Sequence, residues 1–511
     1  MYICEKGILM KIRYISGTLT LILLAAAVCG CGATEEQPSV KDSGTSSTEN
    51  IESSDSETTE LVPDLPAYDG GGRDFRILGK MEGNMSGRWT AKDITVEAQD
   101  GDVVNDAVYK RNLLIESKYN INICDGYFDM STMYADITKL MSAGDNDYDY
   151  IMPTIEAAAQ LARDGLLYDL SEIGNVDLSK PWWSAQFNKD VNIGGKSYYA
   201  DGDICMTFIR ASYCMLFNKK LVEDYGISDP YTMVLDGKWT IDNMLAEAEK
   251  YAADINGDDK YDSDDQVGLG VLHNHAQVFY AASGSKLVTY DAGRGFTFTG
   301  GTERSINVLD KIMSVYTSKN SVINFANQRQ RSKAQNGMDQ VNAAADVFGS
   351  GRMLFLAGTM NDVPTMRDMI ADFGIIPYPK YDEAQDKYYT YVQTWASGCA
   401  AITIDAKDPA VSSMILEDMA YHSSKFIIPA YFEKALKNKY ARDNESQTML
   451  DLICENRTCD IGSIFNIGDL ISNITEKTNS GKGNFASMIA EAQSKIDTEL
   501  QEISDLYLKN E

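Results

Sequence analysis

The sequence has few positive charges for its length. Its 511 residues include 46 Lys and Arg against 75 Asp and Glu, so the formal net charge at pH 7 is −29. Lys and Arg form no dense cluster along the chain. Because neutralising phosphates requires a basic patch, this composition excludes nucleic acid as a partner. It also disfavours direct electrostatic binding to anionic lipid.

Long hydrophobic runs are also scarce. The single long run covers residues 19–31 (LTLILLAAAVCGC) and follows a basic flank that contains Lys11 and Arg13. This is the layout of a secretory signal, and the run is too short to span a bilayer as a mature helix. The alternative, an N-terminal helix of an intracellular domain, would need a polar face, which this run lacks.

The end of this run, Val28-Cys29-Gly30-Cys31, resembles the bacterial lipobox, in which a small residue precedes an acylated cysteine. Gly30 is small whereas Val28 is bulky, so Cys31 is the predicted lipidation site. We therefore expect residues 1–31 to be a lipoprotein signal peptide.

Cysteine is too dispersed for a disulfide framework. Of nine cysteines, three lie in the first 31 residues, and the others are scattered over a chain far longer than a small disulfide scaffold. Cys454 and Cys459 are close enough in sequence to pair across a short loop or to remain reduced.

Motifs of catalysis are missing or incomplete. No G-x-S-x-G elbow occurs. Gly195-Lys196-Ser197 ends like a phosphate loop, but Asp190 stands where its first glycine belongs. His273 and His275 have no third metal ligand at helical spacing. The sequence therefore favours a protein that is not an enzyme, while an extracellular glycoside hydrolase with two facing carboxylates stays open as an alternative.

The composition changes sharply after Cys31. Residues 32–67 are rich in Ser, Thr, Glu and Asp and nearly devoid of apolar side chains, as in TSSTENIESSDSETTE. Such a segment cannot bury enough surface to offset the entropy of ordering. We expect a disordered acidic linker with a reach of roughly 30 Å. A tether of this kind would hold the folded part, residues 68–511, near the membrane.

The first part of the folded region alternates between strand and helix patterns. Strands are predicted at 73–78, 121–124 and 148–152, with helices at 102–120 and 131–142 between them. This order predicts an α/β fold with a mainly parallel sheet. Ligands of such sheets bind beyond the carboxyl ends of the strands.

Seven segments in this region resemble the family 1 extracellular solute-binding proteins, the substrate-capturing lipoproteins of ABC importers. They lie in the same order along residues 68–511 as in that family. The segments are 102–120, 151–173 (IMPTIEAAAQLARDGLLYDLSEI), 177–204 (DLSKPWWSAQFNKDVNIGGKSYYADGDI), 215–231 (MLFNKKLVEDYGISDPY), 237–252 (GKWTIDNMLAEAEKYA), 348–358 (FGSGRMLFLAG) and 372–383 (DFGIIPYPKYDE).

This resemblance implies an α/β, two-lobe periplasmic-binding-protein-like fold of type II, with the ligand cleft between the lobes. Lobe 1 would comprise residues 68–212 and 354–420, and lobe 2 would comprise 213–353 and 421–511. The expected protein is a monomer on the extracellular face of a cell membrane, in a Gram-positive bacterium. It would capture a carbohydrate, an oligosaccharide by preference, and deliver it to the permease subunits of an ABC transporter. The same fold binding a peptide or another polar solute is an open alternative.

Sugar capture requires aromatic side chains for the C–H faces of the rings and polar groups for the hydroxyls. Trp395, in YVQTWASGC, occupies a position where the family has a cleft loop, and the other tryptophans considered lie in predicted loops. The predicted ligand-binding residues are Trp89, Trp182, Trp183 and Trp395 among the aromatics, and Glu156, Asp201, Asp203, Arg210, Asn361 and Asp362 among the polar residues.

An acidic stretch at 254–265 (DINGDDKYDSDD) has the spacing of a calcium loop, with oxygen ligands at alternate positions. Asp259 replaces the usual turn glycine and Asp265 replaces the usual Glu, so we expect weak binding of a structural Ca²⁺; the alternative is an acidic surface turn. No other cofactor is required. The predicted ligands are Asp254, Asn256, Asp258, the carbonyl of Lys260, Asp262 and Asp265.

Overall fold

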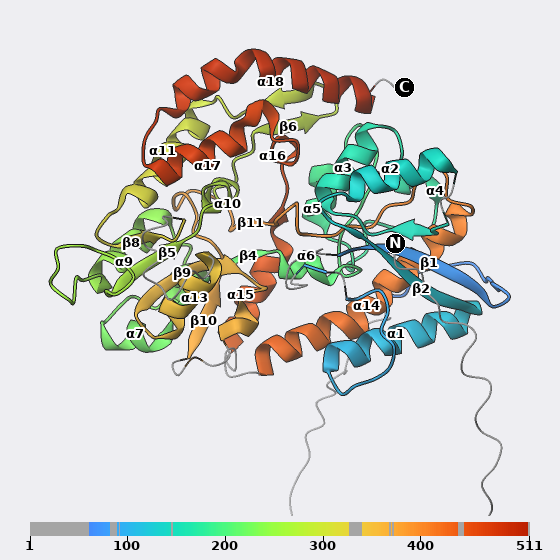
Figure 1. The fold of residues 1–511 in the computed structure, drawn as a ribbon, viewed down its shortest axis with the longest axis horizontal. Helices are drawn as coiled ribbons and strands as arrows, with labels where there is room; N and C mark the ends of the chain where they lie inside the picture. Colours follow the sequence, from blue (N-terminus) through green and yellow to red (C-terminus); the bar gives the residue numbers. More distant parts are fainter. Residues whose placement is uncertain are drawn as a thin grey trace, which may run out of the picture. The chain divides into compact units, whose positions relative to one another are not determined.

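The computed structural model describes residues 61–81, 89–90, 92–144, 147–326, 340–366, 369, 372–437 and 444–508 (Figure 1). The predicted signal peptide, the lipidation site at Cys31 and most of the predicted linker lie outside these residues. Residues 61–67, the end of that linker, form neither helix nor strand. From Pro63 onward the chain forms one compact unit.

The first sheet is parallel and has the strand order β2-β1-β3. Its strands are β1 (Arg73–Met81), β2 (Ile121–Asp129) and β3 (Tyr150–Ile151). Helix α1 (Val103–Tyr119) connects β1 to β2, and α2 (Met133–Ala143) connects β2 to β3. The predicted strand and helix order of this region is confirmed.

Helix α1 shows why the local prediction succeeded. The Asp102 carboxylate caps its first turn by accepting from the backbone N–H of Val104 and Asn105. The helix ends at Asn120, which has a left-handed φ of 48°. The apolar side chains predicted to share one face are buried, namely Val104, Ala107, Val108, Ile115 and Tyr119.

The second sheet has five strands in the order β10-β4-β9-β5-β8. They are β4 (Tyr213–Asn218), β5 (Val267–Val271), β8 (Val322–Asn324), β9 (Met353–Thr359) and β10 (Phe373–Ile376). β5 is parallel to both β8 and β9, whereas β4 is antiparallel to β9 and β10. Every residue of β4, β5 and β9 is buried, as expected for strands that are covered on both faces.

We call the elements around the first sheet the first lobe and those around the second sheet the second lobe. The predicted return of the chain to the first lobe at Leu354 is wrong, because β9 and β10 pair with β4 in the second sheet. Backbone bridges to the first lobe come later in the chain, where Gly398 pairs with Thr154 and Ala401 pairs with Ile151. The sequence indicates the strands here, but it does not show which sheet they join.

The predicted change of lobe after residue 420 is also wrong. Helix α14 (Pro409–Lys437) lies along α1 (Figure 1), and Ile427 shares an apolar cluster with residues of α1. The Arg111 guanidinium of α1 donates to Ser423 Oγ at 3.1 Å, and Lys118 Nζ lies 2.7 Å from Asp418 Oδ2. The first half of α14 and residues beyond 420 therefore pack together on the first lobe.

The remaining elements surround the two sheets. In Figure 1, α17 and α18 lie close to α11, and β6 and β7 form an antiparallel hairpin beneath α18. The helices are α3 (Ile155–Arg163), α4 (Leu170–Ile173), α5 (Ala185–Val191), α6 (Met206–Arg210), α7 (Lys219–Asp224), α8 (Pro230–Leu235), α9 (Ile241–Tyr251), α10 (His275–Ala282), α11 (Glu303–Thr317), α13 (Gln340–Gly349), η1 (Val363–Met366), α15 (Asn444–Glu455), α16 (Ile461–Ile464), η2 (Ile467–Asp469), α17 (Leu470–Ser480) and α18 (Phe485–Leu508). The remaining strands are β6 (Val288–Asp291), β7 (Gly295–Phe298), β11 (Thr390–Tyr391) and β12 (Arg457–Thr458).

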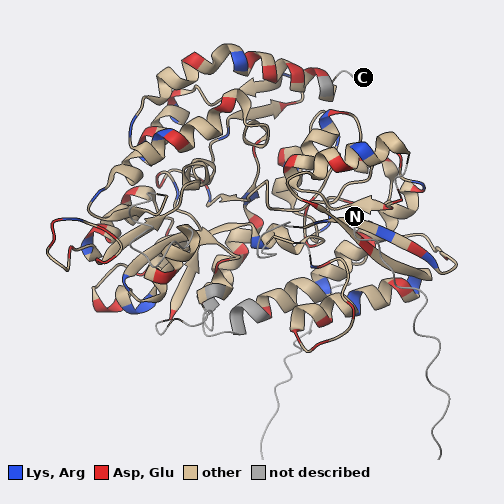
Figure 2. Ribbon diagram, viewed as in Figure 1, with Lys and Arg blue, Asp and Glu red and all other residues tan. Residues whose placement is uncertain are grey.

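Acidic and basic residues are both scattered along these elements, among residues that are mostly uncharged (Figure 2). In the part of the chain that the structure covers, no helix has both the length and the apolar character needed to cross a membrane.

Candidate functional site

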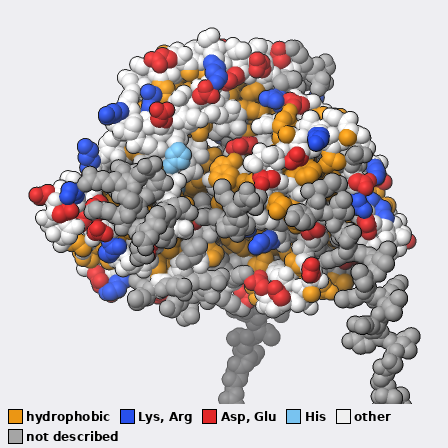
Figure 3. Space-filling view, viewed as in Figure 1, with side chains coloured by type: hydrophobic (Ala, Val, Ile, Leu, Met, Phe, Trp, Pro, Cys, Tyr) orange, Lys and Arg blue, Asp and Glu red, His pale blue; other side chains and the backbone are white. Residues whose placement is uncertain are grey.

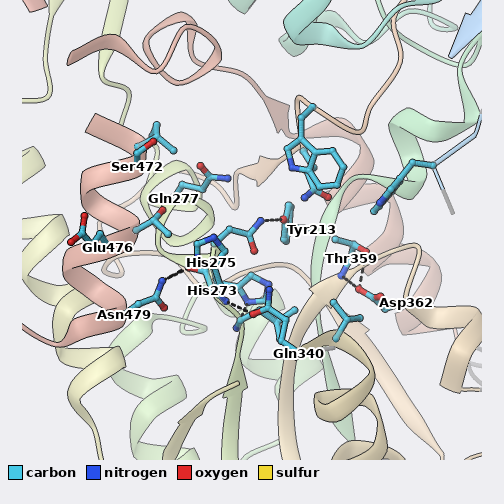
Figure 4. A pocket seen from close by; sticks show the side chains of 18 of the residues that line it. Tyr213, His273, His275, Gln277, Gln340, Thr359, Asp362, Ser472, Glu476 and Asn479 are labelled. Carbon is cyan, nitrogen blue, oxygen red and sulfur yellow. Dashed lines mark hydrogen bonds between the residues drawn. The ribbon is translucent and has the colours of Figure 1, made fainter. Parts of the chain in front are cut away.

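A cavity of about 930 Å³ lies where the second sheet meets loops of the first lobe (Figure 4). Figure 3 shows apolar side chains gathered near the centre of one face of the molecule, with charged side chains mostly around them. The cavity is lined by Trp89, Tyr213, Leu272, His273, Asn274, His275, Gln277, Gln340, Val341, Thr359, Asp362, Gln393, Trp395, Ile471, Ser472, Thr475, Glu476, Asn479 and Ser480.

The floor of the cavity follows from the strand directions. β5 and β9 are parallel, so Leu272 and Thr359 come at the same edge of the sheet. β4 is antiparallel to β9, and its first residue, Tyr213, pairs with Thr359 at that edge. The carboxyl edge of an open α/β sheet is where ligands of such folds bind, so the cavity occupies the expected place.

The turn between β5 and α10 is held rigidly at this edge. Leu272 N–H donates to His275 Nδ1 at 3.3 Å, and Asn274 Nδ2 donates to Tyr213 Oη at 2.8 Å. The rings of Tyr213 and His275 make an edge-to-face contact with centroids 5.6 Å apart. Burial lowers the pKa of His275 to about 3, so this imidazole is neutral and structural at physiological pH.

Helix α17 supplies a polar wall. Ser472, Thr475, Glu476, Asn479 and Ser480 line the cavity at intervals of three and four residues, which places them on one face of the helix. The opposite face is buried through Leu470, Ile474 and Thr478. The wall therefore offers hydroxyl, amide and carboxylate groups from an element fixed by its own apolar side.

Two tryptophans approach the cavity from loops of the first lobe. The rings of Trp89 and Trp395 meet at 74° with centroids 6.1 Å apart. Trp395 is 40% exposed while Trp89 is only 5% exposed, so Trp89 buttresses a ring whose face remains open. An edge-to-face pair of this kind fixes the orientation of the exposed indole.

Glu156 stands next to this pair at the start of α3. Its Oε1 accepts from the hydroxyl of Thr394 at 2.9 Å, directly before Trp395 in the chain. Burial raises the pKa of the Glu156 carboxyl, and the Thr394 bond opposes that shift. The structure places Glu156 beside the tryptophan loop, outside the lining of the cavity.

Of the ten residues predicted to bind ligand, the structure brings Trp89, Asp362 and Trp395 together in the lining of the cavity. The Asp362 carboxylate accepts from the backbone N–H of Thr359 at 2.7 Å and from its hydroxyl at 2.8 Å. Arg210 and Asn361 pair with each other nearby, with Arg210 Nε donating to Asn361 Oδ1 at 2.9 Å.

Trp182 and Trp183, which the sequence predicted as ligand-binding residues, lie outside the cavity lining. They are 2% and 3% exposed, and their indole N–H groups donate to the two carboxylate oxygens of Glu417 at 2.9 and 2.8 Å. This shared carboxylate holds both rings in the core of the first lobe. Burial raises the pKa of Glu417 to about 7, with the indole bonds acting in the opposite direction.

Asp201 and Asp203 also lie outside the cavity lining. Asp201 is fully buried, and its Oδ1 accepts from the backbone N–H of Gly202 at 2.7 Å. Burial raises the pKa of Asp203 to about 6, and the nearby Arg457 guanidinium lowers it. These carboxyl groups belong to a buried polar cluster between β12 and the first lobe.

The predicted calcium loop is a set of carboxylates that bond to their own backbone. The Asp254 carboxylate accepts from the N–H groups of Gly257 and Asp259, and the Asp265 carboxylate accepts from those of Ile255 and Asp262. Among the residues that the structure describes, no three His, Cys, Asp or Glu side chains form a group that could hold a metal ion. Calcium binding here stays a prediction of the sequence spacing.

Cys454 and Cys459 are not joined in a disulfide. Of the two states left open by the sequence, the structure shows the reduced one. Burial raises the pKa of both thiols, which keeps them protonated and unreactive.

Most of the polar lining was missed by the sequence analysis. The α17 residues carry a usable signal, because Ser472, Thr475 and Asn479 recur at helical spacing opposite an apolar stripe. His273 and Gln340 carry none, because they reach the cavity only through strand pairing and the position of α13. Tyr213 is the first residue of β4, and its place at the cavity follows only from the antiparallel pairing of β4 with β9.

Two α/β lobes with an aromatic and polar cavity between them define the protein as a two-lobe ligand-binding protein of the type II periplasmic-binding class. A family model described as "Bacterial extracellular solute-binding protein" matches residues 116–411. The chain belongs to this family. No curated protein matches it by sequence at a significant level.

Solved structures of similar fold share little sequence with the chain. A cyclic α-maltosyl-1,6-maltose binding protein from Arthrobacter globiformis is 14% identical with a TM-score of 0.56, covering 84% of this chain and 100% of that one. An ABC substrate-binding protein from Listeria monocytogenes, in complex with cycloalternan, is 12% identical with a TM-score of 0.53 and coverage of 84% and 99%. A maltose/maltodextrin-binding domain from Bdellovibrio bacteriovorus, bound to maltotriose, is 13% identical with a TM-score of 0.50 and coverage of 84% and 100%. At these identities the likeness establishes the fold.

Proposed function

We propose that this protein captures a carbohydrate, an oligosaccharide by preference, and delivers it to an ABC importer. The observation that carries the proposal is the combination of an exposed indole, Trp395, with the polar wall of α17 across one cavity. A sugar ring offers an apolar C–H face to an aromatic ring and hydroxyl groups to polar side chains at its edge. Proteins of similar fold carry names or ligands of the same chemical class.

The architecture supports capture by closure. Trp89 and Trp395 belong to loops of the first lobe, whereas Tyr213, the turn at His273 and α17 belong to the second. A solute that contacts both walls would stabilise the arrangement in which they are close together. Two-lobe binding proteins commonly close around their ligand by a hinge motion. A transporter could then recognise the closed form.

Anchoring completes the proposal and rests on the sequence alone. Acylation of Cys31 would anchor the protein at the extracellular face of a Gram-positive membrane. The linker to residue 67 would then hold the binding unit, a monomer in this proposal, within reach of the permease subunits. Mass spectrometry of protein extracted from its native membrane tests this point. A diacylated N-terminal Cys31 is expected, and an unmodified N-terminus before this residue would contradict it.

The test of solute class is thermal unfolding against a panel of neutral oligosaccharides, short peptides and polyols, followed by analysis of the solutions for hydrolysis. A ligand present at 100 times its Kd and bound only by the folded state adds about 2.7 kcal/mol of stability. A shift with an intact oligosaccharide supports the proposal. A shift only with a peptide, or cleavage of the sugar, would overturn it in favour of another solute or of a hydrolase.

A further inference from the structure

The carboxylate of Glu156 is attached to the beginning of helix α3. Thr154 precedes this helix, and its hydroxyl accepts from the backbone N–H of Ala157 at 3.1 Å. Glu156 is half-buried in the first turn, where the helix dipole favours a negative charge. Its backbone is therefore fixed by a capped helix end that follows β3 of the first sheet.

The segment that carries Trp395 is a tight turn joined to the same helix end. The carbonyl oxygen of Gln393 accepts from the N–H groups of Ala396 at 3.1 Å and Ser397 at 2.8 Å, which closes the turn. The carbonyl oxygen of Ser397 accepts in turn from the N–H of Ile155, the first residue of α3, at 3.2 Å. The backbone after Trp395 is thus bonded to the residue directly before Glu156.

Thr394 adds a side-chain bond between the turn and the helix. Its hydroxyl donates to Glu156 Oε1 at 2.9 Å, and the residue is only 3% exposed. The same hydroxyl interacts with the phenol of Tyr391, whose ring packs against Tyr213 with centroids 5.6 Å apart. The residue directly before Trp395 is therefore held through its side chain.

The indole of Trp395 depends on this turn for its orientation. One side of the ring meets Trp89 at 74°, with centroids 6.1 Å apart, and 40% of the residue stays exposed beside the cavity. A side chain that must first be ordered lowers affinity, so a ring oriented in advance binds a solute more tightly. Contacts that hold the turn can therefore raise affinity without touching the solute.

We propose that Glu156 is a positioning residue of the solute site, and that it acts through Thr394 to hold the turn from which Trp395 meets the captured solute. This inference rests on the proposed function of the cavity. The sequence predicted Glu156 as a direct ligand contact, and its place outside the cavity lining favours the indirect role. Two consequences separate the roles. Breaking the bond should alter the indole without solute, and its effect on affinity should vanish once Trp395 is removed.

The first measurement uses the full chain without solute, labelled with 5-fluorotryptophan. The chain has five tryptophans, so the fluorine spectrum can be assigned by substituting each one in turn. Thr394→Val keeps the shape of the side chain and removes the hydroxyl, and it should shift or broaden the Trp395 resonance. Glu156→Ala is a second route to the same change if the first variant folds poorly. Trp239 is fully buried, donates to the carbonyl of Pro377 and should not respond.

Conservative variants distinguish this bond from a general loss of structure. Thr394→Ser retains the hydroxyl and Glu156→Gln retains a carbonyl acceptor, so both should restore the wild-type Trp395 resonance. Tyr134→Phe is the matched control, because it removes a hydroxyl bond to the Asp164 carboxylate at the other end of α3. This control should leave the resonance unchanged. A Trp395 resonance that does not move in Thr394→Val and Glu156→Ala would overturn the inference.

The second measurement is calorimetric titration with maltotriose, or with the oligosaccharide that gives the largest thermal shift in the panel. Thr394→Val and Glu156→Ala should each lower affinity about 3-fold, in the lower part of the range for one hydrogen bond. Adding Glu156→Ala to Trp395→Ala should lower affinity no further, because the indirect effect needs the indole. An equal loss with and without Trp395 would overturn the inference in favour of a direct contact of Glu156 with the solute.

The two proposals fail in different ways. If an oligosaccharide binds while the Trp395 resonance and the affinity of Thr394→Val stay unchanged, this inference fails and sugar capture stands. If no oligosaccharide in the panel binds, sugar capture fails. A Trp395 resonance that moves in Thr394→Val and returns in Thr394→Ser would then still support the positioning of the indole by Glu156.

Discussion

At the scale of single residues, the two kinds of tryptophan in this protein have different consequences when they are changed. Trp395 is 40% exposed beside the cavity, whereas Trp182 is 2% exposed and bonded to Glu417. Both are aromatic residues in irregular segments, and sequence alone gives them the same appearance. The exposed fraction of each side chain distinguishes them: Trp395 can contact a ligand, whereas Trp182 packs in the core.

Replacing Trp395 by Ala is predicted to weaken sugar binding by about tenfold, because one aromatic contact contributes on the order of 1.4 kcal/mol. The thermal transition of the free protein should fall less than it would for a fully buried tryptophan, since Trp395 is 40% exposed. Isothermal titration calorimetry measures the affinity.

Trp182→Phe is the matched control for Trp395→Ala. It should lower stability by leaving one Glu417 oxygen without its indole donor, while affinity remains. An unchanged affinity in Trp395→Ala together with a reduced affinity in Trp182→Phe would contradict the placement of the site.

Glu417 is predicted to make stability depend on pH. Its pKa is raised to about 7 in the folded protein, from an ordinary value of 4.5. Between these values the folded state retains a proton that the unfolded state has released, so stability falls as pH rises and levels off above 7. At about 1.4 kcal/mol per pKa unit the full shift corresponds to roughly 3 kcal/mol, and screening by solvent reduces the expected loss to about 2 kcal/mol.

Urea denaturation between pH 4.5 and 8 checks this prediction in wild type and in Glu417→Gln. The variant should show a flatter profile over that window, because the titrating group is gone. Glu502→Gln, at an exposed position of α18, should retain the wild-type slope. Equal slopes in wild type and Glu417→Gln would show that another group is responsible.

At the scale of elements, the loop at 254–265 is stabilised by its own carboxylates. Asp265 is fully buried, and it accepts from two backbone N–H groups. Asp265→Ala is predicted to destabilise the protein by about 1 to 3 kcal/mol, because it removes the buried acceptor of these two N–H groups. Asp264→Ala, one residue earlier and exposed, should cost much less. Chemical denaturation measures both, and equal losses would contradict the capping role of Asp265.

The same loop carries the calcium prediction. Millimolar Ca²⁺ should raise the thermal transition of the wild-type protein if the spacing acts as a weak extracellular calcium loop. The increase should vanish in Asp254→Asn combined with Asp258→Asn. An identical transition with Ca²⁺ and with chelator would show that the loop is an acidic turn.

The elements that could be predicted from the sequence are those specified locally. The β1, α1, β2, α2 and β3 order follows from hydrophobic periodicity and from capping residues such as Asp102. The lobe assignment of β9 was wrong because strand pairing joins Tyr213 to Thr359 across more than a hundred residues. The same reason limits how much of the site could be predicted. Trp395 was predicted as a ligand contact from its loop, whereas His273 reaches the cavity only through the pairing of β5 within the sheet.

At the scale of the whole molecule, the account depends on a cavity built jointly by two lobes. The first lobe supplies aromatic rings, the second supplies hydroxyl, amide and imidazole groups, and neither set alone surrounds a solute. Affinity should therefore require both walls. A double-mutant cycle with Trp395→Ala and Glu476→Ala measures how far their contributions are coupled through the bound sugar.

The most direct test of the central claim is the thermal unfolding of the protein with a panel of neutral oligosaccharides, with Trp395→Ala run in parallel. The account predicts a concentration-dependent rise in the transition with at least one intact oligosaccharide, and a smaller rise in the variant at the same concentration. A transition that no oligosaccharide moves, or one that moves equally in both proteins, would contradict sugar capture in this cavity.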